Sequence, residues 1–179
     1  MLKDKVKVYK DVFSEEDVKI IQGHLSAPNW AWGNYSDEKS KHKPFWGMHL
    51  GHLDFFSKHL YKIVYDLIQS SYTGEVGQLL SIERIYANGQ TFGLDGSWHI
   101  DHPFGCTFLY YANTEWKEGW EGNTVFRDPK TDEIFSIYPE PNSAIYFPGN
   151  VLHYGQAPSK DFTGLRTTIP YKLFKTKYL

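Results

Sequence analysis

From about residue 79 onward, the chain is a succession of short runs rich in β-branched and aromatic residues, separated by Gly, Pro, Asn and Asp at intervals of about ten residues. This pattern is typical of a sandwich or barrel, because each run is long enough for one strand and each break supplies turn residues. The predicted strands are Leu79–Ala87, Ser97–Asp101, Cys106–Ala112, Thr124–Phe126, Ile134–Ile137, Ser143–Phe147 and Leu165–Leu173.

The N-terminal part has a helical pattern. Ser14 followed by three acidic residues predicts a helix start, since the serine oxygen can accept from free amides and the acids complement the helix dipole. Apolar residues then recur at helical spacing, and they do so again from Leu53 to about Tyr72. Between these helices, residues 27–50 carry aromatic residues among Pro, Gly, Asn, Ser and Lys, which predicts a long irregular segment. It is either a lid or substrate wall, or a loop that its aromatic residues fix to the core.

The chain has 179 residues, enough for one domain with a hydrophobic core and too few to expect two. It contains no internal repeat, low-complexity tract or linker. We therefore predict a single domain over residues 1–179, mainly β with flanking α. A jelly roll spans about residues 76–174, and N-terminal helices within about residues 1–73 pack on one of its sheets.

Composition excludes several classes of protein. A formal net charge of -2 with dispersed positive residues gives no basic field, so we expect no nucleic-acid partner. Cys106 is the only cysteine, which excludes an intrachain disulfide and favours the reducing cytoplasm. The sequence shows no secretory signal and no apolar run of membrane-spanning length, so we expect a soluble, unanchored protein.

His99 and Asp101 lie two residues apart, and residues at that spacing on a strand project from the same face. Two histidines and one carboxylate form a facial triad that suits iron(II) and leaves coordination positions open. The pair alone is a weak signal, because it also fits a surface pair near a turn. His153, which follows a predicted strand and turn, supplies the second histidine.

Arg166 opens the strand that comes after His153. The planar guanidinium can bind a carboxylate through two hydrogen bonds inside a barrel, and the distal carboxylate of 2-oxoglutarate is such a partner. The alternative is an internal ion pair between Arg166 and an Asp or Glu side chain.

Five motifs in order resemble the prolyl 4-hydroxylase branch of the iron(II)- and 2-oxoglutarate-dependent dioxygenases over about residues 76–174. They are Ile85-Tyr-Ala-Asn-Gly-Gln90, His99-Ile-Asp101, Thr107-Phe-Leu-Tyr-Tyr-Ala-Asn113, Gly122-Asn-Thr-Val-Phe126, and Leu152-His153 with Arg166. The resemblance implies a double-stranded β-helix with iron at its mouth.

The resemblance also implies roles for six residues. His99, Asp101 and His153 would be the catalytic iron ligands, Arg166 would bind the distal carboxylate of 2-oxoglutarate, and Tyr86 and Tyr111 would hydrogen-bond this co-substrate. The implied cofactors are iron(II), 2-oxoglutarate as co-substrate and O2, with ascorbate as an optional addition.

The implied reaction is hydroxylation of a C–H bond, with succinate and carbon dioxide formed from 2-oxoglutarate. Asp101, in place of Gly or Ala, leaves no vacant position for a halide and so favours hydroxylation over halogenation. The leading substrate is a peptidyl proline or another protein side chain, and a free amino acid or small metabolite comes next.

The chain departs from the family at two places. Arg166 stands where many prolyl hydroxylases have Lys, 13 residues after His153, and extra residues around Gly93–Gly96 border the mouth. The first weakens the assignment to a subfamily, and the second leaves the substrate open.

Two other classes of function remain open. The jelly roll could be a non-catalytic module that binds a metal or 2-oxoglutarate, or a metal-dependent hydrolase, which would need a general base beside the metal.

Several other residues are weaker candidates for a role. His102 is expected to point away from Asp101. Four histidines match no closed zinc pattern: His42, His49, His52 and His59. Four further residues could either contact substrate or serve packing and turns: Asn88, Asp95, Trp98 and Arg127.

Overall fold

The computed structural model describes residues 2–70 and 80–175, and two antiparallel sheets form its framework. The larger sheet contains β1 (Lys7–Tyr9), β2 (Ala31–Asn34), β3 (Phe45–His49), β4 (Leu80–Gln90), β5 (Gly105–Tyr111), β8 (Ala144–Pro148) and β10 (Arg166–Lys175). The smaller sheet contains β6 (Thr124–Arg127), β7 (Ile134–Ile137) and β9 (Leu152–Gly155). The strand orders are β1-β8-β5-β10-β4-β3-β2 and β7-β6-β9.

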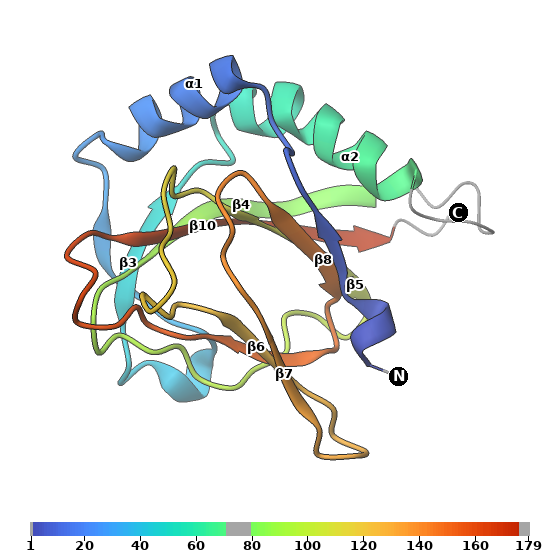
Figure 1. Cartoon of the computed structure of the whole chain (residues 1–179). Helices are drawn as coiled ribbons and strands as arrows, with labels where there is room; N and C mark the ends of the chain where they lie inside the picture. Colours follow the sequence, from blue (N-terminus) through green and yellow to red (C-terminus); the bar gives the residue numbers. More distant parts are fainter. Residues whose placement is uncertain (1, 71–79, 176–179) are drawn as a thin grey trace.

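Two helical segments cover the face of the larger sheet that is turned away from β6 and β7 (Figure 1). Helix α1 (Glu15–Leu25) starts where the sequence predicts, because the Ser14 hydroxyl accepts from the Asp17 amide at 3.1 Å. A π-helical segment, η3 (Phe55–Leu60), continues directly into α2 (Tyr61–Ser70). The predicted helix end near Tyr72 and the predicted strand start at Leu79 lie outside the described residues.

Each face of the larger sheet has its own apolar core. The core between the helices and the sheet includes Ile21, Phe56, Val64, Ile85, Phe108 and Tyr171. The core between the two sheets is smaller and contains Leu109, Tyr111, Phe126, Ile145, Phe147 and Val151. Alternate residues of β5 enter the two cores, as Phe108 and Leu109 do, because successive side chains of a strand point to opposite faces.

The predicted fold class is confirmed: the protein is mainly β, with a jelly roll and N-terminal helices packed on one sheet. Six of the seven predicted strands are present within a few residues of their predicted bounds, and β1, β2, β3 and β9 are additional. No helix in the described part of the chain is long and apolar enough to cross a membrane.

The prediction of an irregular segment over residues 27–50 is wrong. This segment contains β2 and β3, which extend the larger sheet beyond β4, and a short 3-10 helix, η2 (Glu38–Ser40). The pairing is between distant residues, with Met48 opposite Ala87 and Trp46 opposite Gly89. Pairing with β4 organises a segment whose local composition resembles that of a loop.

The prediction of a strand over Ser97–Asp101 is also wrong. Within this stretch only His99 pairs as an isolated bridge, and its partner is His153. Two hydrogen bonds make the bridge, from the His99 amide to the His153 carbonyl at 2.9 Å and from the His153 amide to the His99 carbonyl at 3.0 Å. The segment is therefore an incomplete fourth strand beside β9.

Candidate metal and co-substrate site

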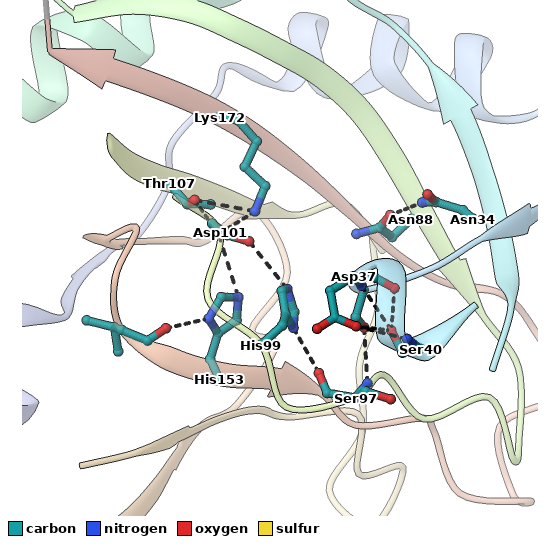
Figure 2. Close-up of polar contacts among 12 residues, drawn as sticks. Asn34, Asp37, Ser40, Asn88, Ser97, His99, Asp101, Thr107, His153 and Lys172 are labelled. Carbon is teal, nitrogen blue, oxygen red and sulfur yellow. Dashed lines mark hydrogen bonds and ion pairs between the residues drawn. The ribbon is translucent and has the colours of Figure 1, made fainter. Parts of the chain in front are cut away.

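The three predicted metal ligands lie together at one end of the space between the sheets. One potential ligand atom from each of His99, Asp101 and His153 lies within 4.8 Å of the others. His99 Nε2 is 3.3 Å from Asp101 Oδ1, and His153 Nε2 is 3.6 Å from Asp101 Oδ2. Figure 2 shows both imidazole rings facing the Asp101 carboxylate. A single cation can therefore be held by all three side chains.

Backbone contacts place these side chains although no regular strand carries His99 and Asp101. The paired amides and carbonyls of His99 and His153 fix the two histidines side by side. The Asp101 amide donates to the Gly149 carbonyl at 2.8 Å, which fixes the carboxylate end of the same segment. His99 and Asp101 thus still project from the same face, as residues two apart on a strand do, although only one bridge is formed.

Both imidazoles have their outer nitrogen occupied by a backbone carbonyl. His99 Nδ1 lies 2.8 Å from the Ser97 carbonyl, and His153 Nδ1 lies 2.9 Å from the Val151 carbonyl. A carbonyl only accepts, so Nδ1 carries the proton and Nε2 is left as a lone-pair donor toward the cluster. Burial also lowers the pKa of His153 to about 4, which keeps this ring neutral near pH 7.

The Asp101 carboxylate is ionised despite its burial. Burial alone would raise its pKa, but the adjacent Lys172 ammonium outweighs burial and holds the pKa well below the usual value. Lys172 forms an ion pair with Asp101 Oδ2, and the Thr107 hydroxyl donates to the same oxygen at 2.5 Å. The site therefore presents one ionised carboxylate and two imidazoles.

Arg166 lines the same cavity from the first residue of β10 and is only 2% exposed. Its Nε donates to the Gly122 carbonyl at 2.6 Å, and its Nη1 donates to Gln90 Oε1 at 2.7 Å. The remaining nitrogen, Nη2, is buried and has no hydrogen-bond partner among the described residues. Burial lowers the pKa of Arg166 to about 10, so the group is cationic at neutral pH.

An internal ion pair for Arg166, the alternative open from the sequence, is not found: no carboxylate in the described parts of the chain forms a salt bridge with it. A buried cation without a counter-charge is costly. Arg166 is therefore arranged for an anion that the described residues do not supply.

The cavity between these groups has a volume of about 60 Å³. Polar side chains from β4 and β10 line it together with apolar residues from β5 and β8, such as Leu109 and Phe147. Tyr86 lines this cavity, and burial raises the pKa of its hydroxyl. Its position is compatible with the predicted contact to a co-substrate, which stays a prediction.

Tyr111 is not among the described residues that line the cavity. Its side chain is buried in the core between the sheets, and its hydroxyl donates to Thr124 Oγ1 at 2.8 Å. Thr124, in contrast, lines the cavity. In this arrangement Tyr111 orients Thr124, and its predicted contact with the co-substrate stays a prediction.

The other candidates fall outside the cluster of ligand atoms. His102 Nδ1 accepts from the Phe104 amide at 3.0 Å, which is a turn contact. His49 and His52 face each other, with Nδ1 atoms 3.0 Å apart, and His59 Nε2 lies 2.7 Å from Asp17 Oδ1. Within residues 2–70 and 80–175, the group of three at His99 is the one cluster that could hold a metal ion.

Of the residues expected near the open end, Asn88 lines the cavity and accepts from the Asn34 side chain at 2.7 Å. Arg127 instead forms an ion pair with Asp132. Asp95 accepts from the Ala157 amide, and Trp98 packs edge-to-face on Tyr154. These three have local structural partners.

Lys172, Thr107 and Gln90 belong to the site but were missed by sequence reasoning. A usable signal existed for Lys172, because it lies six residues after Arg166 and residues an even number apart share one face of a strand. Thr107 and Gln90 offered no such signal, since both depend on pairing with β10.

No protein-family model matches the sequence, and no curated protein sequence matches it. Solved structures do match. A prolyl hydroxylase from Trichoplax adhaerens, in complex with a peptide fragment of the hypoxia inducible factor oxygen degradation domain, has a TM-score of 0.71 and 16% identity, over 96% of this chain and 84% of that chain.

Two further structures show the same architecture. A 2OG-Fe(II) oxygenase family oxidoreductase from Burkholderia pseudomallei has a TM-score of 0.72 and 11% identity, over 98% of this chain and 87% of that chain. HygX from Streptomyces hygroscopicus, with nickel, 2-oxoglutarate and hygromycin B bound, has a TM-score of 0.69 and 10% identity, over 97% of this chain and 84% of that chain. The chain therefore has the fold shared by 2OG-Fe(II) oxygenases and prolyl hydroxylases.

Proposed function

We propose that this protein is a 2-oxoglutarate- and iron(II)-dependent dioxygenase that hydroxylates a C–H bond. The observation that carries the proposal is the pairing of two features in one cavity. A His-Asp-His cluster stands where a metal can be held, and Arg166 offers a buried, unpartnered Nη2. A small acid that chelates a metal and carries a second carboxylate satisfies both.

The residues fit iron(II) by the chemistry of their donor atoms. Neutral imidazole nitrogens and one carboxylate oxygen are the ligands of the facial triad in non-haem iron(II) oxygenases. His99, Asp101 and His153 would hold the metal, which when bound supplies the coordination positions and electrons for oxygen chemistry. The Ser97 and Val151 carbonyls fix the ligand tautomers in advance.

The rest of the chain binds and orients the co-substrate. Arg166 would hold the distal carboxylate, with Gln90 and Gly122 fixing the plane of the guanidinium. The Tyr86 hydroxyl lies on the cavity wall, and its raised pKa keeps it protonated as a donor. Leu109 and Phe147 exclude water from this wall, which strengthens the ionic contact.

A second cavity of about 430 Å³ provides the proposed substrate side. It is lined by β2 and β3 residues together with Arg84 and Tyr86, and Tyr86 borders both cavities. Gly47 forms part of its lining, where any larger residue would meet the Asn34 side chain. We favour a peptidyl proline or another protein side chain as substrate, because this larger cavity has room for a chain segment and shares Tyr86 with the first cavity.

The alternative within the same reaction class is an oxygenase that acts on a small molecule. The similar structures have both kinds of molecule bound, a peptide fragment in one and hygromycin B in another, so both substrate classes stay open. A mass gain of one oxygen on a proline-containing peptide would support the first. The same gain on a free amino acid or small metabolite, with none on peptides, would support the second.

The hydrolytic alternative is less well supported by the site. A hydrolase needs a general base beside the metal-bound water. Among the described residues that line the cavity there is no Glu or Asp, and Asp101 is committed to the metal cluster and to Lys172.

The test is succinate formation from 2-oxoglutarate by protein loaded anaerobically with iron(II) and then exposed to oxygen. We expect slow turnover without substrate in the native protein and its loss in His99→Ala and Asp101→Ala. The matched control is His42→Ala, which changes an exposed histidine outside the cluster. Equal succinate formation in all four proteins would contradict the proposal, and 2-oxoglutarate binding without turnover on any substrate tested would favour a binding module.

A further inference from the structure

Lys172 is a buried lysine inside the proposed active site. It lies on β10, lines the cavity, and is only 7% exposed. Figure 2 shows its ammonium reaching the Asp101 carboxylate from the side opposite the two imidazoles. Few lysines are buried in this way, because removing an ammonium from water is costly unless an anion pairs with it.

The charge on Lys172 is maintained by its partner. The ammonium forms an ion pair with Asp101 Oδ2, so the buried cation has a carboxylate as its counter-charge. The lysine is thus a fixed positive charge beside a metal ligand.

The contacts to Asp101 are unequal between its two oxygens. Oδ2 takes part in the ion pair with Lys172 and accepts from the Thr107 hydroxyl at 2.5 Å. Oδ1 lies 3.3 Å from His99 Nε2, which is the unprotonated nitrogen of that ring and donates nothing. One oxygen is therefore held by two donors, and the other is free to bind a cation.

We propose that Lys172, assisted by Thr107, is a positioning residue that keeps Asp101 as a ligand through one oxygen only; this inference rests on the proposed function. A carboxylate that binds through both oxygens takes up two coordination positions. Holding Oδ2 by an ammonium and a hydroxyl prevents this and keeps a position available to the co-substrate.

The fixed charge acts on the two ligands in opposite directions. A positive charge beside the triad repels a divalent cation and attracts the doubly negative 2-oxoglutarate. Removing that charge should therefore strengthen metal binding and weaken co-substrate binding. A general loss of structure would instead weaken both.

The experiment compares Lys172→Met with the native protein by calorimetric titration, first with manganese(II) and then with 2-oxoglutarate in the manganese-loaded form. We expect manganese to bind about tenfold more tightly and 2-oxoglutarate about tenfold more weakly in the variant, which is about 1.4 kcal/mol in each direction. Lys172→Arg, which keeps the charge and the donors, should lie close to the native protein. Lys160→Met, at an exposed lysine, is the control for a change of net charge.

Thr107→Val provides a second variant, should Lys172→Met not fold. It removes one donor to Oδ2 while the ammonium stays, so we expect the same two changes at smaller size. Affinities that fall together in either variant, or that do not change in Lys172→Met, would overturn the role of Lys172 while leaving the proposed function intact. Native protein that binds no manganese would overturn both.

Discussion

At the scale of single residues, the site is defined by charges that the fold keeps apart from water. Arg166 has hydrogen bonds to Gly122 and Gln90 but no counter-charge among the described residues, and Lys172 has its counter-charge in Asp101. The two cations lie on the same face of β10, one at its start and one near its end. One strand therefore supplies the proposed binding group for the co-substrate and the group that holds the carboxylate ligand.

Replacing Arg166 by Met should separate function from stability. The substitution removes a buried, uncompensated charge but also two hydrogen bonds, so we expect the free energy of unfolding to change by less than about 1 kcal/mol. Metal-loaded native protein should melt at a higher temperature with 2-oxoglutarate, and the variant should not. Thermal melts with and without the acid measure this, with Arg127→Met as control, and an unchanged ligand-induced rise in the variant would contradict the role of Arg166.

The sequence allowed the triad and Arg166 to be predicted because their types, order and spacing are read directly. Lys172 was not predicted, because a lysine on a strand is ordinarily assigned to the solvent face. Only the fold shows that Asp101, distant in sequence, lies within reach of its ammonium. The contact predicted between Tyr111 and the co-substrate stays a prediction, because alternation gives the face of β5 on which Tyr111 lies but not its depth in the core.

At the scale of elements, the turn before β6 sets the position of Arg166. Gly122 adopts a φ of +73°, and its carbonyl accepts from Arg166 Nε. A Cβ at this position would lie 2.7 Å from the Trp116 ring and 3.1 Å from Arg166 Cδ. Both the conformation and the space require glycine here.

Gly122→Ala should therefore weaken 2-oxoglutarate binding by displacing the guanidinium. Gly119→Ala is the matched control, because Gly119 also has a positive φ, of +88°, but a Cβ added there would meet no described atom within 4 Å. Gly119→Ala should lose about 1 kcal/mol of stability from backbone strain, and Gly122→Ala should lose more, because its Cβ also clashes with the Trp116 ring. Only Gly122→Ala should lose affinity, by about tenfold or more. Equal affinities in the two variants, measured by titration, would show that Arg166 is not held by this turn.

The bounds of a strand were predictable where the local sequence pattern determines them. They were not predictable where pairing with a distant strand determines them. Strand β7 has the predicted bounds, because turn residues flank a short apolar run. The pair β2 and β3 has the local sequence of a loop, since glycine, asparagine and lysine interrupt it and its order comes from β4. The prediction around His99 was wrong in the opposite direction: a sequence typical of a strand forms only one bridge.

At the scale of the whole molecule, the two faces of the larger sheet have different roles. Its outer face packs on the helices and forms the larger core, and its inner face carries the charged groups of the cavity (Figure 1). Stability and chemistry therefore depend on different sides of the same strands.

Phe56→Ala should lower stability without altering the site. Phe56 is fully buried between the helices and the sheet, and truncating such a side chain costs about 3–5 kcal/mol. Urea unfolding measures the loss, and the affinity of the folded variant for 2-oxoglutarate should remain within about twofold of native. Phe104→Ala, at a residue that is 79% exposed, is the control. A large loss of affinity with little loss of stability would contradict this separation.

The proposed function requires one cavity to hold iron(II) and 2-oxoglutarate together. A 2-oxo acid that chelates iron(II) gives a visible charge-transfer band, so anaerobic titration of the iron-loaded protein with 2-oxoglutarate tests the claim directly. We predict a band that saturates in the native protein, is absent in His153→Ala, and requires a much higher concentration of the acid in Arg166→Met. A folded, iron-loaded native protein that develops no band at any concentration of the acid would contradict the account.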